Sequence, residues 1–389
     1  MPEFPRFSSS VTAMPGAVYS AVTARLAGYS GEVYPLNVGD TWMEPPAGCR
    51  MEDLSVLEHP GLHRYTPPAG LPELRRAIAE RTEASTNLAT QAAEVLVGAG
   101  ATAALSTVVG ALLDPGDEVL LMAPYWPLIA GMVTAFRGVP VAVPFFSPTE
   151  APATAEEAVQ AFARRRTDRS VAIYLNSPHN PSGRVLPPEW AKALVAWARE
   201  EGLWILSDEV YEPFTYGTGH LPLRPLAPEK TVTIHSFSKA YGMTGNRCGY
   251  LVGPRELIQQ CNKIGTHTYY CAPRAGQLAA RAALESVEAA SWLAQARDRY
   301  AELGRRAARI LGLPPPEGST FFFLDLAGRL DERGLMGFLE DCADQGILLA
   351  PGPSFGPFPT CVRVCFTCAE PAVVLRGFEK LAGLLETTN

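Results

Sequence analysis

The chain of 389 residues has no long apolar segment, no block of basic residues and no internal repeat. No hydrophobic run approaches the ~18 residues that a membrane-spanning helix needs, so the sequence does not predict a membrane protein. The net charge of −7 is mild, which argues against general binding to nucleic acids or membrane surfaces. The first residues lack the basic and then apolar order of a signal sequence, and we therefore expect a cytoplasmic protein.

Cysteine is also sparse, with eight residues scattered along the chain, so a disulfide framework is not expected. One Cys-x-x-Cys occurs, at Cys365 and Cys368. It has neither the second pair that a zinc site needs nor a thioredoxin-like context. We interpret these cysteines as buried reduced thiols and predict no metal site.

Apolar strand-like runs alternate with helical stretches through most of the chain, and this alternation is typical of a mostly parallel sheet covered on both faces. The length is ample for a large core and suggests two domains. From residue 274 to about 311 the pattern predicts one long or interrupted helix that leads to a second region. The expected strands are 94–97, 119–122, 139–145, 170–175, 204–208, 231–234, 248–253, 320–326 and 362–364.

Ser236-Phe237-Ser238-Lys239 follows one of these strands, at the end where open α/β sheets place their ligand chemistry. A lysine amine there can form a Schiff base if its surroundings lower its pKa. Ser236 and Arg247 could both hold an anion beside it. The Ser-x-x-Lys pattern alone is weak, since it also occurs in serine acyl-transferases, so this interpretation depends on partners elsewhere.

A glycine turn, Gly98-Ala99-Gly100, joins the strand 94–97 to a helix. Free N–H groups and the helix dipole make such a turn a phosphate site. Gly98-x-Gly100-x-x-Ala103 also fits a dinucleotide fingerprint, which requires an acidic residue at the end of the next strand. That strand ends in Met-Ala-Pro instead, so the dinucleotide alternative is disfavoured.

Two charged residues lie in apolar strands. Asp208 ends one strand and must be paired. Its neighbour Glu209 should point to the opposite face, which disfavours a pair of carboxylates acting on one substrate. Arg363 lies inside another strand and needs an anion, either a ligand carboxylate or a structural salt bridge.

These motifs, spread over residues 35–366, resemble in kind and order those of fold-type I pyridoxal-phosphate (PLP) enzymes, specifically the class I/II aminotransferases. The matching segments are Leu36-x-x-Gly39-Asp40, Tyr65-x-x-x-x-Gly70, Gly100-Ala101-Thr102, Pro124-x-Trp126-Pro127, Asn176-x-Pro178-x-Asn180-Pro181-Ser182-Gly183, Asp208-Glu209-x-Tyr211, Ser236-x-x-Lys239, Gly245-x-Arg247-x-Gly249 and Arg363.

The resemblance implies the α/β, PLP-dependent transferase fold of type I. In this fold a large domain, with a mostly parallel seven-stranded sheet covered by helices, is joined to a smaller α+β domain. We expect residues 1–45 to form an N-terminal arm and part of the small domain, 46–290 the large PLP-binding domain and 291–389 the small C-terminal domain.

The resemblance also implies roles for single residues. Lys239 would hold the cofactor aldehyde as a Schiff base, Asp208 would keep the pyridine nitrogen protonated, and Tyr211 would donate to the phenolic oxygen. Arg363 would clamp the substrate α-carboxylate, with Asn180 and Gly39 beside it. The other cofactor contacts would come from Gly100, Ala101, Thr102, Trp126, Asn180, Ser236 and Arg247, and from Tyr65 of the neighbouring subunit in a homodimer.

The function implied is aminotransfer from an L-amino acid to a 2-oxo acid by a ping-pong mechanism. A lyase, cyclase or synthase, similar to capreomycidine or aminocyclopropane-carboxylate synthases, would keep the same cofactor residues and stays open. A PLP-binding regulator would carry an N-terminal DNA-binding module, and only about 35 residues precede the first motif.

The substrate is less defined by the sequence. Dicarboxylate-specific members need a second cation, and the sequence does not place one. Tyr125, His179, Tyr269 and Tyr270 suggest an aromatic or polar substrate pocket.

Overall fold

A computed structural model describes residues 5–14, 25–148, 150–217 and 219–387. Its centre is a seven-stranded sheet in the order β1-β7-β6-β5-β4-β2-β3, in which β7 alone runs antiparallel to its neighbours. The mostly parallel α/β fold predicted from the sequence is therefore confirmed. The strands are β1 (Val95–Gly98), β2 (Glu118–Ala123), β3 (Val139–Pro144), β4 (Ser170–Asn176), β5 (Trp204–Asp208), β6 (Thr231–Ser236) and β7 (Gly249–Val252).

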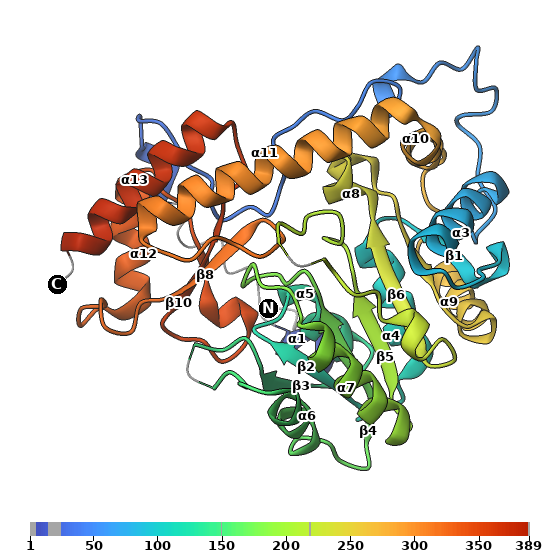
Figure 1. Cartoon of the computed structure of the whole chain (residues 1–389), viewed down its shortest axis with the longest axis horizontal. Coiled ribbons are helices and arrows are strands. Elements are labelled where there is room, and N and C mark those ends of the chain that lie inside the picture. Colours follow the sequence, from blue (N-terminus) through green and yellow to red (C-terminus); the bar gives the residue numbers. More distant parts are fainter. Residues whose placement is uncertain (1–4, 15–24, 149, 218, 388–389) are drawn as a thin grey trace.

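Helices cover both faces of this sheet, as the near-continuous apolar strands require (Figure 1). On one face α4 (Ala101–Leu112), α5 (Pro127–Ala135) and α9 (Arg255–Thr268) pack on alternate strand residues such as Leu121 and Leu206. On the other face α6 (Ala155–Ala163) and α7 (Pro188–Glu200) cover the intervening residues. Helices α3 (Pro72–Thr86) and α10 (Arg274–Glu285) pack at the edge formed by β1 and β7.

A second, three-stranded antiparallel sheet has the order β8-β10-β9, with β8 (Phe321–Asp325), β9 (Ala350–Pro351) and β10 (Cys361–Cys365). Its apolar core includes residues of α12 (Gly334–Asp344) and α13 (Pro371–Thr387). Tyr34 and Leu36, from near the N-terminus, are buried in the same core.

The long helical pattern after residue 274 is interrupted once. Helix α10 ends at Glu285, and α11 runs from Val287 to Leu311. Ser286 separates them because its hydroxyl accepts the N–H of Ala289 at 3.1 Å and so caps α11. Helix α11 then extends from α10 to the second sheet (Figure 1).

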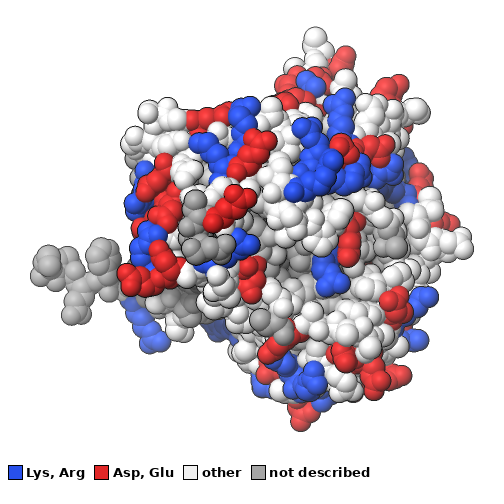
Figure 2. Space-filling view, turned by 60° about the vertical axis from the view of Figure 1, so that its left-hand side comes forward, with Lys and Arg blue, Asp and Glu red and all other residues white. Residues whose placement is uncertain are grey.

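The remaining described helices are short: α1 (Ser9–Ala13), α8 (Phe237–Ala240) and the 3₁₀ turns Leu26–Gly28, Met51–Asp53, Ala92–Glu94, Arg224–Leu226, Thr244–Asn246 and Gly352–Phe355. The predicted N-terminal arm lies partly outside the described residues. Within the described ranges, none of the helices has the length and apolarity needed to span a membrane. Acidic and basic side chains border one another over much of the face in Figure 2.

Candidate active site

A cavity of about 350 Å³ lies where β4, β5 and β6 end, the side of a parallel sheet at which ligands bind. The N-terminus of α4 borders it from the large sheet, and Arg363 of β10 borders it from the small one. Its lining is Gly39, Ala101, Thr102, Leu105, Trp126, Pro127, Leu128, Asn176, Asn180, Asp208, Val210, Tyr211, Ile234, Ser236, Ser238, Lys239, Thr244, Arg247 and Arg363. All the residues to which the family resemblance gave a role are among these except Gly100 and Tyr65.

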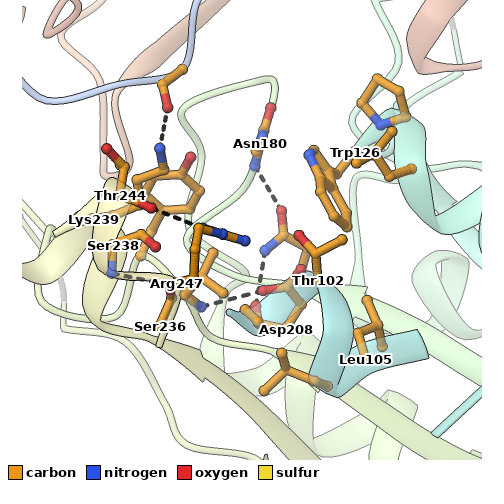
Figure 3. Close-up of a pocket in the computed structure, with 18 of the residues that line it drawn as sticks. Thr102, Leu105, Trp126, Asn180, Asp208, Ser236, Ser238, Lys239, Thr244 and Arg247 are labelled. Atoms are coloured by element: carbon orange, nitrogen blue, oxygen red, sulfur yellow. Dashed lines mark hydrogen bonds between the residues drawn. The ribbon is translucent and has the colours of Figure 1, made fainter. Parts of the chain in front are cut away.

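Lys239 enters the cavity from the short helix α8 (Figure 3). Its Nζ donates to the carbonyl oxygen of Gly39 and lies 3.9 Å from Oδ1 of Asp40. Burial lowers the pKa of the lysine, while the Asp40 carboxylate opposes this shift. The lowered pKa increases the share of neutral amine, which is the nucleophilic and proton-accepting form.

Asp208 ends β5 at the floor of the cavity and is buried. Its Oδ2 accepts the hydroxyl of Tyr174, and its Oδ1 accepts the N–H of Val210 at 3.3 Å. Burial raises the pKa of Asp208 to about 6, and these two hydrogen bonds act in the opposite direction. A carboxylate in this position can accept a hydrogen bond from a protonated ring nitrogen.

Asn176 fixes the loop that carries Asn180. Its side chain donates to the carbonyl oxygen of Asp208 at 2.9 Å and accepts the N–H of Asn180 at 2.8 Å. The first bond joins the ends of β4 and β5, and the second fixes the loop after β4. As a result the Asn180 side chain faces the cavity, where its Oδ1 accepts a hydrogen bond from Nη1 of Arg363 at 3.0 Å.

Arg363 is buried at the opposite end of the cavity, with its guanidinium 4.3 Å from the ring centre of Phe321 and 4.9 Å from that of Phe355. Its Nη2 donates to the carbonyl oxygen of Asn37 at 2.7 Å. Its buried Nε has no hydrogen-bond partner. Among the described residues no carboxylate forms an ion pair with Arg363, so the structural salt bridge considered above is not found there. A buried guanidinium with an unpaired N–H is suited to an anionic ligand.

The third part of the cavity is a cradle at the start of α4. Gly100 has φ 86°, and a Cβ there would lie 2.3 Å from a guanidinium nitrogen of Arg247. A Cβ on Gly249 would lie 2.3 Å from the backbone nitrogen of Ala101. These glycines bring Arg247 and the first N–H groups of α4 together, and the hydroxyls of Thr102 and Ser236 line the same region. Together they make an anion site of the kind that holds a phosphate.

Aromatic side chains form the walls. Trp126 stands directly before α5 and lines the cavity (Figure 3). Tyr211 is buried, and its ring packs edge-on to Phe321 at 5.7 Å. Burial raises the pKa of Tyr211, so it remains a hydroxyl donor. An amine, a carboxylate, aromatic walls and an anion cradle in one cavity are the groups that PLP requires, and the residues therefore fit this cofactor.

The residues that suggested an aromatic or polar substrate pocket do not line this cavity of the described chain. Tyr125, His179, Tyr269 and Tyr270 are all outside the cavity lining. His179 is fully buried, with Nδ1 2.7 Å from Oγ of Ser182 and its ring against Phe146. Burial lowers the pKa of His179 to about 3, so it is neutral.

Tyr65 is also absent from this cavity. Its side chain is 81% exposed and packs edge-on to Tyr270 at a ring distance of 5.0 Å. An exposed tyrosine away from the cavity of its own chain is available to another chain. The structure describes a single chain, so its role in a neighbouring subunit stays a prediction.

Glu209 points away from the cavity, as strand alternation predicts. Ligand atoms of Glu209, Glu212 and His235 lie within 4.8 Å of one another, an arrangement that could hold a metal ion. Two nearby basic groups already pair with these carboxylates, His220 with Glu209 at 3.2 Å and Arg81 with Glu212 at 3.0 Å. Each carboxylate of the cluster therefore already has a basic partner within the protein.

Sequence reasoning gave no role to several residues that build the site. Ser238 and Thr244 line the cavity. Ser238 lies within the lysine motif and Thr244 directly before the arginine motif, so a hydroxyl beside a recognised motif was the available signal. Tyr174 was missed entirely. The signal was a hydroxyl-bearing residue within a buried apolar strand, where such a group needs a partner.

A family model described as "Aminotransferase class I and II" matches residues 32–381. The chain belongs to this family. The probable aspartate/prephenate aminotransferase of Thermus aquaticus is 33% identical over 97% of this chain and 99% of its own length. The aspartate aminotransferase of Streptomyces avermitilis is 29% identical over 98% of this chain and 96% of its own length. The solved structure of Thermus thermophilus aspartate aminotransferase with maleate has a TM-score of 0.86 and 29% identity, and covers 98% of this chain.

The family match and these relatives show that the protein is a PLP-dependent transaminase with the fold of the aspartate aminotransferases. The expectations of family, fold class, enzyme class and cofactor are therefore confirmed.

Proposed function

We propose that this aminotransferase moves an amino group from an L-amino acid to a 2-oxo acid by a ping-pong mechanism, with PLP bound to Lys239 as a Schiff base. One observation carries the proposal. The amine of Lys239, whose pKa burial lowers, the carboxylate of Asp208 and the guanidinium of Arg363, which has an unpaired Nε and no carboxylate partner among the described residues, face the same cavity.

Residues at the Arg363 end would bind the substrate. The guanidinium of Arg363 takes the α-carboxylate in a forked pair, supported by the amide of Asn180. The backbone of Gly39 approaches closely, since a Cβ there would lie 2.8 Å from the Phe321 ring and 3.8 Å from Nη2 of Arg363. This end fixes the direction of the Cα–H bond relative to Lys239.

Residues of the large sheet would hold the cofactor. The cradle of Ala101, Thr102, Ser236 and Arg247 would bind the phosphate, and Gly100 would allow the backbone to approach it. Trp126 would lie against the ring, and Tyr211 and Asn180 would donate hydrogen bonds to the phenolic oxygen. Asp208 would accept a hydrogen bond from the ring N–H.

The bound cofactor supplies an aldehyde that captures the substrate amino group and a ring that accepts the electron pair of the Cα–H bond. Lys239 moves the proton. Its amine, whose pKa burial lowers, would take the proton from Cα and return it at C4′ of the cofactor.

The proposal includes a homodimer in which Tyr65 reaches the neighbouring active site, and a cytoplasmic location. It also includes the division into an arm (1–45), a large domain (46–290) and a small domain (291–389). The exposure of Tyr65 supports the first of these. Relatives named for aspartate and prephenate support L-aspartate as the first donor to test.

A single-turnover experiment tests the function. Holoenzyme is mixed with L-aspartate, and then with other L-amino acids, without any oxo acid acceptor. We expect one 2-oxo acid per active site and a cofactor that keeps the amino group until an added 2-oxo acid restores its original absorbance. Continued product release without an acceptor would instead establish the lyase, cyclase or synthase alternative.

A further inference from the structure

Tyr174 lies in the middle of β4 and is fully buried, with 0% of its surface exposed. It pairs in register with Leu206 of the parallel strand β5, and Asp208 lies two residues further along that strand. Paired residues of parallel strands, and residues two apart, point to the same face of the sheet. The register therefore brings the hydroxyl of Tyr174 to Oδ2 of Asp208, to which it donates.

The hydroxyl of Tyr174 is important to Asp208 because few other groups donate hydrogen bonds to this carboxylate. The only other hydrogen bond to the carboxylate among the described residues comes from the N–H of Val210 at 3.3 Å. No ion pair in the described part of the chain includes Asp208. On its own segment Asp208 is followed by Glu209 and, three residues on, by Tyr211. The charged groups that line the same cavity from other elements are Lys239 of α8 and Arg247 before β7. The remaining neighbours that line it are uncharged: Asn176 of β4, Ile234 and Ser236 of β6, and Thr102 and Leu105 of α4.

We propose that Tyr174 is a positioning residue, whose hydroxyl keeps the Asp208 carboxylate ionised and oriented to accept the ring N–H of the cofactor. Oδ2 is held by Tyr174 and Oδ1 by the backbone, so the plane of the carboxylate is fixed before it meets a ligand. The inference rests on the proposed function, because it takes Asp208 as the partner of the ring nitrogen.

The consequence is a pH dependence with a definite sign. Burial raises the pKa of Asp208 to about 6, and the Tyr174 hydrogen bond lowers it. Without that hydroxyl the pKa of Asp208 rises further, and the carboxyl of the cofactor-free enzyme takes up a proton at higher pH. When the ring nitrogen is already protonated, a protonated Asp208 must release its proton to solvent before it can accept a hydrogen bond from the ring N–H. The affinity for this form of the cofactor therefore falls as the pH drops through the pKa of Asp208.

Cofactor retention measures this dependence. Wild type and Tyr174→Phe holoenzymes are diluted across a series of pH values, and the absorbance of the lysine-linked cofactor gives the dissociation constant. The wild-type affinity should decline below a pH of about 6. The decline in Tyr174→Phe should begin about one pH unit higher, which makes retention about 10-fold weaker at acidic pH and similar at alkaline pH. The cofactor and Lys239 also titrate, but they do so in both proteins, so the difference between the two pH curves reports on Asp208.

Matched variants separate this role from simple packing. Tyr216→Phe removes another tyrosine hydrogen bond, to the carbonyl oxygen of Ser319 at 2.6 Å, and should leave the pH curve unchanged. Asp208→Asn removes the titrating carboxylate. In that background Tyr174→Phe should change retention by less than about 2-fold, because the two changes act through one group. Tyr174→Leu is a second variant without the hydroxyl, should Tyr174→Phe not fold.

Three outcomes would overturn the inference. If Asp208→Asn weakens retention but Tyr174→Phe follows the wild-type pH curve, Tyr174 has no such role and the proposed function stands. A loss that is equal at every pH and equal in the Asp208→Asn background would make Tyr174 a packing residue. If Asp208→Asn itself leaves retention unchanged, the ring partner is not Asp208, and that part of the proposed function fails as well.

Discussion

The two sides of the cavity differ in how their charged groups are satisfied. On the large sheet, Asp208 accepts the Tyr174 hydroxyl and Lys239 donates to the carbonyl oxygen of Gly39. On the small sheet, Arg363 has an unpaired Nε and no carboxylate partner among the described residues. The carboxylate and the amine of the first side thus have hydrogen-bond partners within the protein. The guanidinium of the second side is also held, by Asn180 and Asn37, but it keeps one unpaired N–H and has no counter-charge among the described residues.

This difference matches two kinds of ligand. A cofactor that stays bound benefits from groups that are already oriented, since less order is lost on binding. A substrate that arrives and leaves at each turnover is held by a strong, directional contact such as the guanidinium fork. Changes on the large sheet should therefore alter cofactor binding or chemistry, and changes on the small sheet should alter substrate binding.

The largest effect is expected at Lys239. Lys239→Ala removes both the cofactor attachment and the group that moves the Cα proton, and kcat should fall by at least about 10⁴-fold. Lys263→Ala, at an exposed lysine of α9 that bonds Gln260, is the control and should keep full activity. A Lys239→Ala enzyme with activity near wild type would remove the basis of the mechanism.

The phosphate cradle should give the next largest effect. Arg247→Gln removes a cation beside the start of α4, and the dissociation constant of PLP should rise about 10- to 100-fold, the cost of a hydrogen bond to a charged group. Titration of the enzyme with PLP checks this. With saturating cofactor the KM for the amino acid should change little, and a KM that rises as much as the PLP constant would show that the two sides are not separate.

Tyr65 tests whether the large-sheet side is completed by a second chain. Lys239→Ala and Tyr65→Ala chains are mixed and refolded into hybrid dimers. If Tyr65 serves the neighbouring site, each hybrid has one site with both residues intact, so activity should return to a substantial fraction of wild type. If activity stays at the level of the Tyr65→Ala homodimer, Tyr65 acts within its own chain.

The smallest effect is expected at Asp40. Its carboxylate lies 3.9 Å from Nζ of Lys239 and raises the lysine pKa against the effect of burial. Asp40→Asn should lower this pKa further, so the amine stays neutral to lower pH. The acid limb of the single-turnover rate should shift to lower pH by less than about one unit, because Asp40 is partly exposed. Asp168→Asn, at an exposed residue paired with Arg166, is the control, and a shift to higher pH at Asp40 would contradict the assignment.

The sequence was sufficient for the parts of the site that depend on local rules. Lys239 and Asp208 stand at strand ends, and strand alternation separates Asp208 from Glu209, so their placement follows from short segments. The sequence also predicts the long or interrupted helix after residue 274. The position of the break at Ser286 depends on a hydroxyl cap.

Sequence reasoning failed where side-chain direction depends on distant contacts. His179 precedes Asn180 in one motif, yet its ring turns toward Phe146 while Asn180 faces Arg363. Tyr174 meets Asp208 only because β4 and β5 pair in one register. Neither arrangement can be derived from local patterns, since each is set by the packing of segments far apart in the chain.

The most direct test of the difference between the two sides is Arg363→Lys, measured for substrate and cofactor in the same preparation. Lysine keeps the charge but loses the fork and the ring contacts. We expect kcat/KM for the amino acid to fall about 100-fold, as for a buried charge pair that is impaired, while the PLP dissociation constant changes less than about 2-fold. Arg376→Lys, at an exposed arginine paired with Glu32, should change neither. If retention of PLP falls in parallel with kcat/KM, Arg363 supports the cofactor side, and the account of two separate sides is wrong.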